Sequence, residues 1–332
     1  MRRLALSPRA RRVLRATLFT GTGARRWMSA GRRKAAVYSF GLMLAVVGAM
    51  IGIMLNHGIG AVLIGLVLIV FFASYIVHEV AIGLELLEKQ DYADEMTAAQ
   101  RVQELLLPSQ LPCQAGLCLA GASTPARDVG GDYYDVLDLG EKRYALVVAD
   151  VAGKGVPAAL LMATVRTLVR DRARRGLAPE ELIREVNQAL LQDTSATQYA
   201  TIFYGILDLD RRELAYVNAG HATPYLVTRR EPALQALDRG GPPVGLLDAA
   251  TYAVARVPVA PGDRIVVYTD GLIDIDPGND RFLDDQELEA LLLRLRAVTP
   301  AEMVSALCAQ VRRLRGGGEG EDDLTLLVAA LE

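Results

Sequence analysis

The chain has 332 residues, of which 52% are hydrophobic, and its mean hydropathy is +0.23. This length allows one large or two ordinary domains, and the high hydropathy predicts a membrane segment. The net charge of −3 conceals two opposite parts, because residues 1–34 hold ten Arg, one Lys and no acid. The remainder holds 25 basic (36 − 11) against 39 acidic side chains, and this acidic balance argues against a nucleic-acid enzyme.

Residues 35–77 predict a transmembrane hairpin. No Asp, Glu, Lys or Arg occurs in them, and residues 35–55 and 58–77 are each long enough to cross a hydrocarbon core as a helix. The basic segment 1–34 is expected to stay in the cytoplasm and to meet anionic lipid, and two spans return the chain to the same side. We therefore expect a multi-pass cell-membrane protein whose N-terminus and residues 78–332 are cytoplasmic. The alternatives are a buried helical hairpin of a soluble domain and, for the Arg-rich start, a nucleic-acid arm or a transit sequence.

Residues 78–112 predict a helical linker. The segment from Glu79 to Leu107 contains no Pro, and Pro108 and Pro112 are expected to end the helix. Its apolar stripe is weak, and acidic residues stand at several heptad positions that would face a partner helix. The sequence therefore does not predict a strict coiled coil. The pattern leaves open whether this linker is a simple connector or forms a homodimer.

Residues 113–332 predict a separate α+β domain. Short β-type runs dominate, many joined by hairpin-sized links, and the helices are grouped rather than alternating with strands. This order favours a sandwich of two antiparallel sheets flanked by helices over a doubly wound fold. The predicted helices are 157–175, 179–192, 285–297 and 300–314, and the predicted strands are 117–123, 133–139, 143–150, 199–209, 213–220, 224–228, 252–259, 263–270 and 323–331.

The cysteines and histidines exclude some kinds of site. Cys113, Cys118 and Cys308 form no metal-ligand spacing and no even framework, so we expect ordinary thiols in a reducing compartment. Of the three histidines, His57 and His78 lie at the ends of predicted membrane segments. A zinc site built from a His cluster is therefore excluded.

Acidic side chains recur where predicted strands begin or end. Asp132 follows two glycines and precedes a strand, Asp150 and Asp270 each end an apolar run, and Asp322 and Asp323 precede the last strand. Each case alone is also explained by a turn, since Asp and Gly are common turn residues. Four recurrences favour a site for a hard divalent cation. With no phosphate-binding P-loop and no nucleophilic Ser elbow, the remaining chemistry is hydrolysis by a metal-held water.

Successive motifs resemble one known family. The segments "ASTPARDVGGDYYDV", "VVADVAGKGVPAALLMATVRTLV", "YATIFYGILDL", "LAYVNAGHATPYLV", "GPPVGLL", "GDRIVVYTDGLID" and "EDDLTLLV" are similar, in order, to those of the bacterial PP2C-like phosphatases of the SpoIIE/RsbU group. "AAQRVQELLLPSQLP" resembles the helix before that domain. The resemblance covers about residues 99–331 and leaves the membrane hairpin outside.

The resemblance implies two bound Mn²⁺ or Mg²⁺ ions. In it, Asp150 bridges both ions, and Asp322 is preferred to its neighbour because the first Asp of such a pair is usually the ligand. An acid before "VGGD" is Asp128 here, where the family usually has Glu, and this puts no metal role in doubt. The implied ligands are Asp132, Asp150, the backbone carbonyl of Val151, Asp270 and one of the pair Asp322 and Asp323.

The resemblance also implies a function. It is that of a PPM-type Ser/Thr protein phosphatase acting on a regulatory phosphoprotein, commonly a STAS-type anti-sigma-factor antagonist in partner-switching control of transcription. One rival is a catalytically silent membrane scaffold. All four acidic positions are occupied here, which argues against it, because a degenerate site is expected to lose some of its acids. A second rival is a metal-dependent nuclease or phosphodiesterase, which the acidic balance disfavours.

Other residues near these motifs carry weaker expectations. Arg127 is a candidate phosphate contact by proximity alone. His221 is either a general acid or, as we prefer, a structural residue that is hydrogen-bonded to a turn at a strand end. Gly130 and Gly131 are expected to supply unusual backbone angles, while residues 153–155 are expected to form a tight turn before a helix. A shift of that helix to complete the metal site is implied by the family only.

Overall fold

The computed structural model describes residues 46–49, 51–53, 55, 59–108, 110–114, 116–193, 198–230, 233–276, 281–315, 320 and 322–332. The chain divides into two compact units, residues 1–95 and residues 96–332. The division falls inside the predicted linker. Each unit is described by itself.

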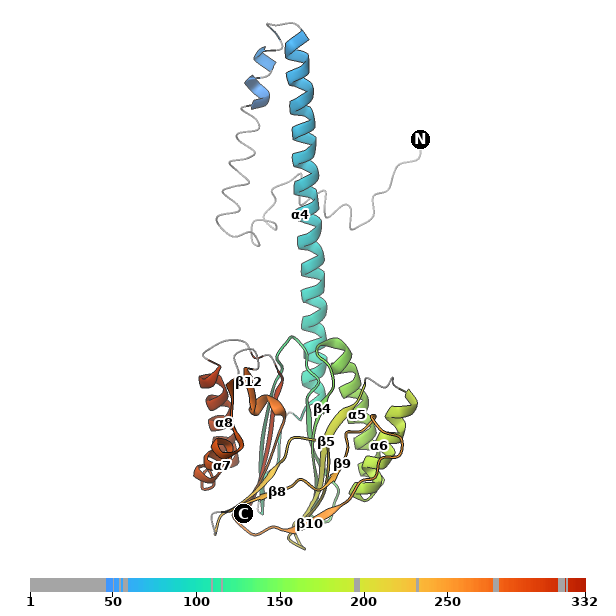
Figure 1. Ribbon diagram of the computed structural model, residues 1–332, viewed down its shortest axis with the longest axis vertical. Coiled ribbons are helices and arrows are strands. Elements are labelled where there is room, and N and C mark those ends of the chain that lie inside the picture. The colour runs from blue at the N-terminus through green and yellow to red at the C-terminus, as the bar shows by residue number, and fades with distance from the viewer. Residues whose placement is uncertain are drawn as a thin grey trace. The chain divides into compact units, whose positions relative to one another are not determined.

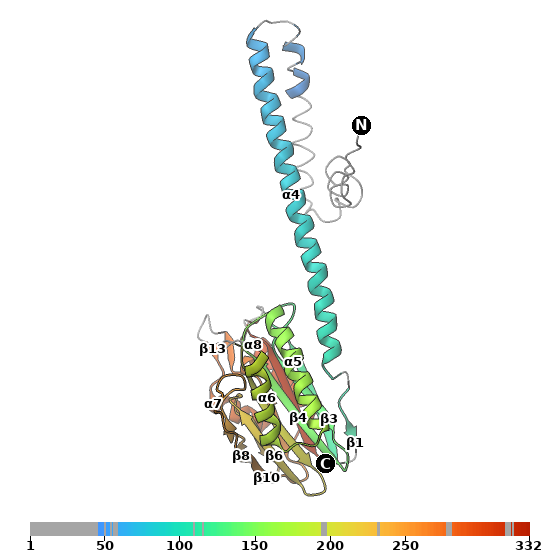
Figure 2. The same ribbon diagram turned by 90° about the vertical axis from the view of Figure 1, so that its right-hand side faces the viewer.

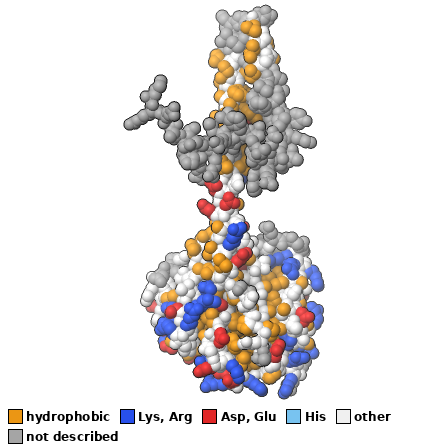
Figure 3. Space-filling view, turned by 180° about the vertical axis from the view of Figure 1, so that it is seen from behind, with side chains coloured by type: hydrophobic (Ala, Val, Ile, Leu, Met, Phe, Trp, Pro, Cys, Tyr) orange, Lys and Arg blue, Asp and Glu red, His pale blue; other side chains and the backbone are white. Residues whose placement is uncertain are grey.

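The first unit is dominated by helix α4 (Ile59–Leu106), whose last residues belong to the second unit. Among the described residues, the segment from Gly65 is long and apolar enough to cross a membrane, as judged by length and composition. Its apolar side chains are mostly exposed, and Figure 3 shows them in orange along the helix. The predicted first span, residues 35–55, lies mainly outside the described residues, although 46–49 and 51–53 are helical. A pair of spanning helices is therefore not established.

The second unit contains two large sheets. One has the strand order β1-β2-β14-β11-β7-β8, and the other has the order β10-β6-β5-β4-β3, with β9 paired to β6. All pairings in these sheets are antiparallel except the short β6–β9 pair. The strands are β1 (Cys113–Gln114), β2 (Leu117–Thr124), β3 (Tyr133–Asp138), β4 (Arg143–Val151), β5 (Ala200–Asp208), β6 (Glu213–Ala219), β7 (Tyr225–Thr228), β8 (Ala233–Ala236), β9 (Gly240–Gly241), β10 (Ala255–Pro258), β11 (Arg264–Tyr268) and β14 (Leu324–Leu331).

The two sheets pack face to face between two helical layers. Helices α5 (Val156–Arg174) and α6 (Pro179–Asp193) cover the β4-containing sheet, and α7 (Asp285–Arg294) and α8 (Pro300–Leu314) cover the β11-containing sheet (Figures 1 and 2). Three clusters of buried apolar side chains fill the three interfaces between these layers. This four-layer arrangement confirms the predicted α+β sandwich.

Local sequence explains where the outer helices begin. Helix α8 has a capping box, in which the Thr299 side chain accepts from the Glu302 backbone N–H and the Glu302 carboxylate accepts from the Thr299 backbone N–H. Helix α7 begins with Asp284, whose carboxylate accepts from the Glu287 N–H at 2.7 Å. Helix α4 ends at Leu106, two residues before Pro108, as expected from the proline.

All nine predicted strands and four predicted helices of this unit are present, with small shifts at their ends. The sequence did not predict the short strands β1, β8 and β9, nor the two-stranded sheet of β12 (Asp274–Asp276) and β13 (Arg281–Phe282). It also missed the 3-10 helix η1 (Asp270–Leu272). These elements are two to four residues long, too short for hydrophobic periodicity to detect.

The prediction that Cys113 and Cys118 are separate thiols is wrong in this structure. The two residues form a disulfide, with Cα atoms 3.9 Å apart. Strands β1 and β2 pair with Gln114 opposite Leu117, which places the two cysteines opposite each other. Gly116, between the two strands, has φ 95°, a backbone angle that favours glycine. Cys308 is a free thiol, as expected.

Candidate metal centre

Two antiparallel ladders bring the predicted acids to one end of the sandwich. In the β3–β4 pair, Tyr133 lies opposite Ala149, so the next pair outward is Asp132 and Asp150. In the β11–β14 pair, Tyr268 lies opposite Leu326, and the chain continues outward to Asp270 on one strand and to residues 322–323 on the other. Register therefore gathers acids that are far apart in the sequence.

Asp132 is the most buried acid of the group, with 3% of its surface exposed. The Thr269 hydroxyl donates to Asp132 Oδ2 at 2.7 Å, and Thr269 Oγ1 accepts from the Thr325 N–H at 2.9 Å. Asp132 precedes β3, whereas Thr269 follows β11 and Thr325 lies in β14 of the other sheet. This chain of hydrogen bonds therefore links the two sheets at the end where the acids lie.

Both carboxylate oxygens of Asp323 accept hydrogen bonds from backbone N–H groups. Its Oδ1 accepts from the Ala126 N–H and its Oδ2 accepts from the Gly131 N–H, both at 2.7 Å. These two charge-assisted hydrogen bonds hold the loop between β2 and β3 in place. The structure thus gives Asp323 a positioning role and leaves Asp322 as the acid of this pair with the freer carboxylate.

Asp322 lies beside a cation. Its Oδ1 is 3.5 Å from Lys154 Nζ, and 34% of the Asp322 side chain and 44% of the Lys154 side chain are exposed. The Arg315 guanidinium donates to the Asp322 backbone carbonyl at 3.3 Å. The sequence patterns assigned no role to Lys154.

The acids raise one another's pKa. Burial raises the pKa of Asp150 to about 7, and the nearby charges of Asp270, Asp322 and Asp323 add to the rise, whereas a hydrogen bond with Asp132 opposes it. Burial raises the pKa of Asp132 well above its ordinary value, and the charges of Asp150 and Asp323 add to this. Buried acids without matching positive charge favour their protonated forms until a cation compensates them.

Asp270 shows the same effect. Burial raises its pKa to about 6, and the charges of Asp322 and Asp274 add to the rise. A hydrogen bond from the Gly271 backbone and the charge of Lys154 both act in the opposite direction. The β-strand ends before Asp270, which is the first residue of η1 and follows a Thr in extended conformation.

Close backbone approach explains two of the motif glycines. A Cβ at Gly130 would collide with the Asp323 carboxylate, and a Cβ at Gly131 would lie 2.7 Å from the Val151 carbonyl oxygen. Neither glycine has a positive φ, so the prediction of unusual backbone angles at these positions is wrong. The glycines are needed because the loop packs against Asp323 and against the carbonyl of Val151.

The turn between β4 and α5 needs glycine for its angles. Gly153 has φ 109° and Gly155 has φ 73°, both in the left-handed region, and Lys154 lies between them. The prediction of a tight backbone before this helix is confirmed. The turn places Lys154 beside Asp322.

His221 is structural in its contacts. It is 6% exposed, and its Nδ1 lies 2.8 Å from Thr201 Oγ1. Asn218 clamps the turn by accepting from the His221 N–H at 2.7 Å and donating to its carbonyl at 3.0 Å. Burial lowers the pKa of His221 to about 4, which keeps the imidazole neutral at physiological pH. Arg127 and Asp128 are exposed in the nearby loop.

Within the second unit, the end of α4 contacts the acid-bearing loop. Gln103 Nε2 donates to the Gly130 carbonyl at 2.7 Å, and Gln103 Oε1 accepts from the Gly130 N–H at 3.1 Å. From α5, Arg166 Nε donates to the Leu106 carbonyl at 2.7 Å. Sequence patterns did not identify these contacts, because single polar residues on a helix carry no periodic signal.

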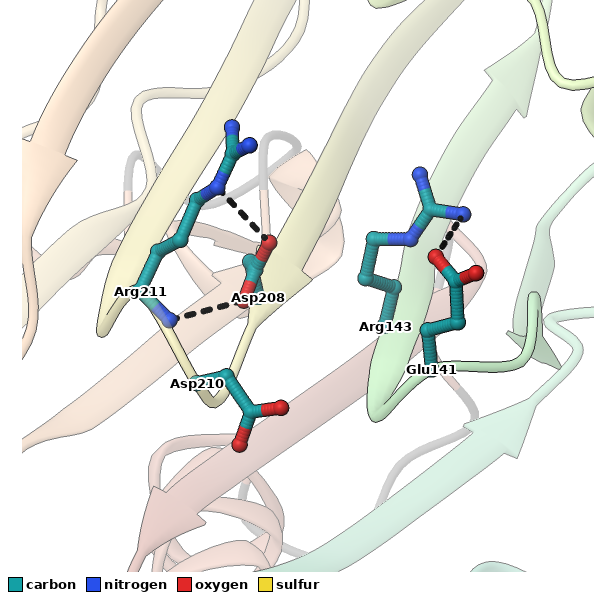
Figure 4. Close-up of a pocket in the computed structure, with 5 residues that line it drawn as sticks. All are labelled: Glu141, Arg143, Asp208, Asp210 and Arg211. Atoms are coloured by element: carbon teal, nitrogen blue, oxygen red, sulfur yellow. Dashed lines mark hydrogen bonds and ion pairs between the residues drawn. The ribbon is translucent and has the colours of Figure 1, made fainter.

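A separate charged pocket of about 410 Å³ lies at the opposite end of the same strands (Figure 4). Arg143 begins β4, seven residues before Asp150, which corresponds to about 23 Å at 3.3 Å per residue. The charges of this pocket are paired. It is lined by Glu141, Arg143, Asp208, Asp210 and Arg211.

The acid cluster offers only oxygen ligands, which suit Mg²⁺ or Mn²⁺. Among the described residues, the one group of three or more potential ligands whose atoms all lie within 4.8 Å of one another is Cys113, Cys118 and Glu332. The two sulfur atoms of that group are bonded to each other. Among the residues that the structure describes, no three of the Asp carboxylates have ligand atoms that close together.

This four-layer sandwich with acids at one end of both sheets defines a PP2C-like phosphatase fold. The SiaA-PP2C domain of Pseudomonas aeruginosa has the same fold, with a TM-score of 0.64, 25% identity and coverage of 74% of this chain and 99% of that chain. The RsbU and RsbW domains of Rv1364c from Mycobacterium tuberculosis match with a TM-score of 0.59 and 29% identity over 68% of this chain and 63% of that chain.

Residues 140–332 match the SpoIIE family, described as Stage II sporulation protein E, and the chain belongs to this family. Phosphoserine phosphatase RsbU of Bacillus subtilis is 26% identical over 262 residues, covering 79% of this chain and 76% of RsbU. Protein IcfG of Synechocystis is 29% identical over 261 residues, covering 70% of this chain and 41% of IcfG. The chain is accordingly a PPM-type phosphatase.

Proposed function

We propose that this protein is a metal-dependent phosphatase that removes phosphate from phosphoserine or phosphothreonine on a regulatory protein. The observation that carries the proposal is the meeting of Asp132, Asp150, Asp270 and Asp322 at one end of both sheets, where burial and mutual charge raise the pKa of Asp150 to about 7. A cluster of uncompensated acids favours divalent cations.

The proposed ligands are Asp132, Asp150, the Val151 carbonyl, Asp270 and Asp322. Two ions, Mn²⁺ or Mg²⁺, would supply a water of lowered pKa and would neutralise the phosphoryl oxygens. Within the chain, Asp323 holds the loop that carries Asp132, and Thr269 orients the Asp132 carboxylate. RsbX, which shares the fold at a TM-score of 0.53 and 19% identity, was solved in complex with magnesium.

The proposed substrate is a STAS-type anti-sigma-factor antagonist in a partner-switching pathway. Two curated relatives, RsbU and RsbP of Bacillus subtilis, are named phosphoserine phosphatases. In Rv1364c, an RsbU domain is found in one protein with an RsbW domain. These names support an output through protein dephosphorylation, and the acidic balance of residues 35–332 disfavours a nucleic-acid partner.

We place the protein in the cell membrane, with two spans at residues 35–77 and with its N-terminus, linker and catalytic domain in the cytoplasm. The exposed apolar stretch of α4 and the basic residues 1–34 support this placement. Homodimerisation through residues 78–112 is proposed as well, since α4 has exposed apolar side chains in that segment, among them Leu84, Leu86 and Val102.

The test is hydrolysis of para-nitrophenyl phosphate by the full chain in detergent micelles, with Mn²⁺, Mg²⁺ or EDTA. Asp270→Asn is compared with Asp210→Asn, the same change in the distal pocket. We expect metal-dependent turnover that EDTA and Asp270→Asn abolish and that Asp210→Asn leaves intact. A folded protein that binds Mn²⁺ by calorimetry and shows no turnover, with the monoester or with a phosphorylated STAS protein, would contradict the proposal and favour a scaffold.

A further inference from the structure

The turn after β4 carries a lysine at the acid cluster. Lys154 lies between two glycines with positive φ, three residues after Val151. Its Nζ is 3.5 Å from Asp322 Oδ1, and its charge lowers the pKa of Asp270. Both acids lie at the edge of the β11–β14 pair, whereas Lys154 extends from the other sheet. The Lys154–Asp322 ion pair thus joins a residue beyond the end of β4 to a residue before the start of β14.

The choice of lysine at this position is unusual for the chain. Among 36 basic residues the sequence holds only four lysines, Lys34, Lys89, Lys142 and Lys154. Arginine carries fixed, forked donors, whereas the lysine ammonium is a compact point charge on a flexible stem. A mobile point charge suits a tetrahedral phosphoryl group that must enter, react and leave.

The ion pair between Lys154 and Asp322 contributes little to the stability of the fold. The Lys154–Asp322 pair is partly exposed, with 44% and 34% of the side chains accessible, and exposed ion pairs contribute little to stability. By contrast, the buried Arg170–Asp135 pair, 2.6 Å apart, shows how this chain builds a structural ion pair, with arginine and a fully buried acid. The Lys154 side chain is 44% exposed and is therefore accessible to a ligand at the acid cluster.

We propose that Lys154 contacts a phosphoryl oxygen of the bound substrate and of the phosphate product. This inference rests on the proposed metal-dependent phosphatase, and it assigns the phosphate-contacting cation that the sequence motifs left open. Arg127, the candidate by sequence proximity, is exposed in the loop between β2 and β3.

The experiment measures phosphate binding as well as turnover. Full-length protein loaded with Mn²⁺ is titrated with inorganic phosphate by calorimetry, and the KM for para-nitrophenyl phosphate is measured in parallel. The variants are Lys154→Met, Lys154→Arg and Arg127→Met. The matched control is Lys142→Met, which removes an exposed lysine paired with Asp210 in the distal pocket.

We expect Lys154→Met to weaken phosphate binding and raise KM by about 10- to 100-fold, the loss typical of a hydrogen bond to a charged group. Lys154→Arg should recover part of the loss, and Arg127→Met and Lys142→Met should match wild type. Mn²⁺ affinity in Lys154→Met should be unchanged or higher, because the substitution removes a positive charge next to the ligands. A loss of phosphate binding therefore cannot arise from a loss of metal.

Two results would overturn the inference. One is wild-type phosphate affinity in Lys154→Met, and the other is a loss that appears in Arg127→Met instead. A wild-type protein that binds Mn²⁺ but hydrolyses nothing would instead overturn the proposed function, so the two failures are distinguishable. Unfolding temperatures of all variants establish that each is folded.

Discussion

Strand β4 has charged groups at both ends, and the two ends balance their charges differently. At its start, Arg143 pairs with Glu141 at 3.1 Å and Lys142 pairs with Asp210 at 2.7 Å. At its finish, Asp150 lies among other acids, and burial with their charges raises its pKa to about 7. Paired charges at a surface need no ligand, whereas an unbalanced cluster is costly unless cations are bound. The unbalanced end is therefore the one at which we propose the metal site.

The largest expected effect is on the stability of the metal-free protein. Between about pH 4 and 7 the folded protein keeps protons on Asp150 and Asp270 that the unfolded chain has released, because their pKa values are raised to about 7 and about 6. The free energy of unfolding in EDTA should therefore fall as pH rises through this window, by up to about 1.4 kcal/mol per pH unit for each such proton.

Unfolding in EDTA at pH 5 and pH 8 measures this effect, with Asp150→Asn as the reference that lacks the main titrating group. Added Mn²⁺ should stabilise the protein more at pH 8 than at pH 5, because ligands must be deprotonated to bind metal. If the free energy of unfolding in EDTA changes between pH 5 and pH 8 no more in wild type than in Asp150→Asn, the acids do not carry the excess negative charge that we infer.

A smaller effect should separate the neighbours Asp322 and Asp323. Asp323→Asn replaces one of two accepting oxygens with an NH₂ group that faces a backbone N–H, which should lower the free energy of unfolding by about 1–3 kcal/mol. Asp322→Asn should leave the metal-free protein as stable as wild type, or more so, and should weaken Mn²⁺ binding. Thermal unfolding and calorimetry measure both quantities. The reverse pattern would exchange the roles of these two acids.

The smallest effect is expected at the distal pocket. Arg211→Met removes a guanidinium whose Nε is 3.7 Å from Asp208 and whose side chain is 77% exposed. Such a pair is screened by solvent, so the unfolding temperature and kcat should not change measurably. A clear loss of turnover in this variant would contradict the inference that only the Asp150 end of β4 takes part in catalysis.

The helices, the strands and the acids were predictable because their signals are local. Apolar periodicity identified α5, α6, α7 and α8, and the runs that end at Asp150 and Asp270 marked two strands of the site. The Cys113–Cys118 disulfide was missed, because spacing alone does not reveal a two-residue strand. Membrane placement was predicted from residues 35–77, of which the first predicted span lies mainly outside the described residues.

By itself, the sequence determined which side chains are available to the site, namely four separated acids after or before apolar runs, because strand ends can be located from local pattern. Only the tertiary structure decided which partners each acid contacts. Asp323 holds Gly131, 192 residues away in the chain, and Lys154 reaches Asp322 from the opposite sheet. Hydrogen bonds and ion pairs over such separations depend on strand register and on the packing of two sheets, and no local pattern of residues encodes them.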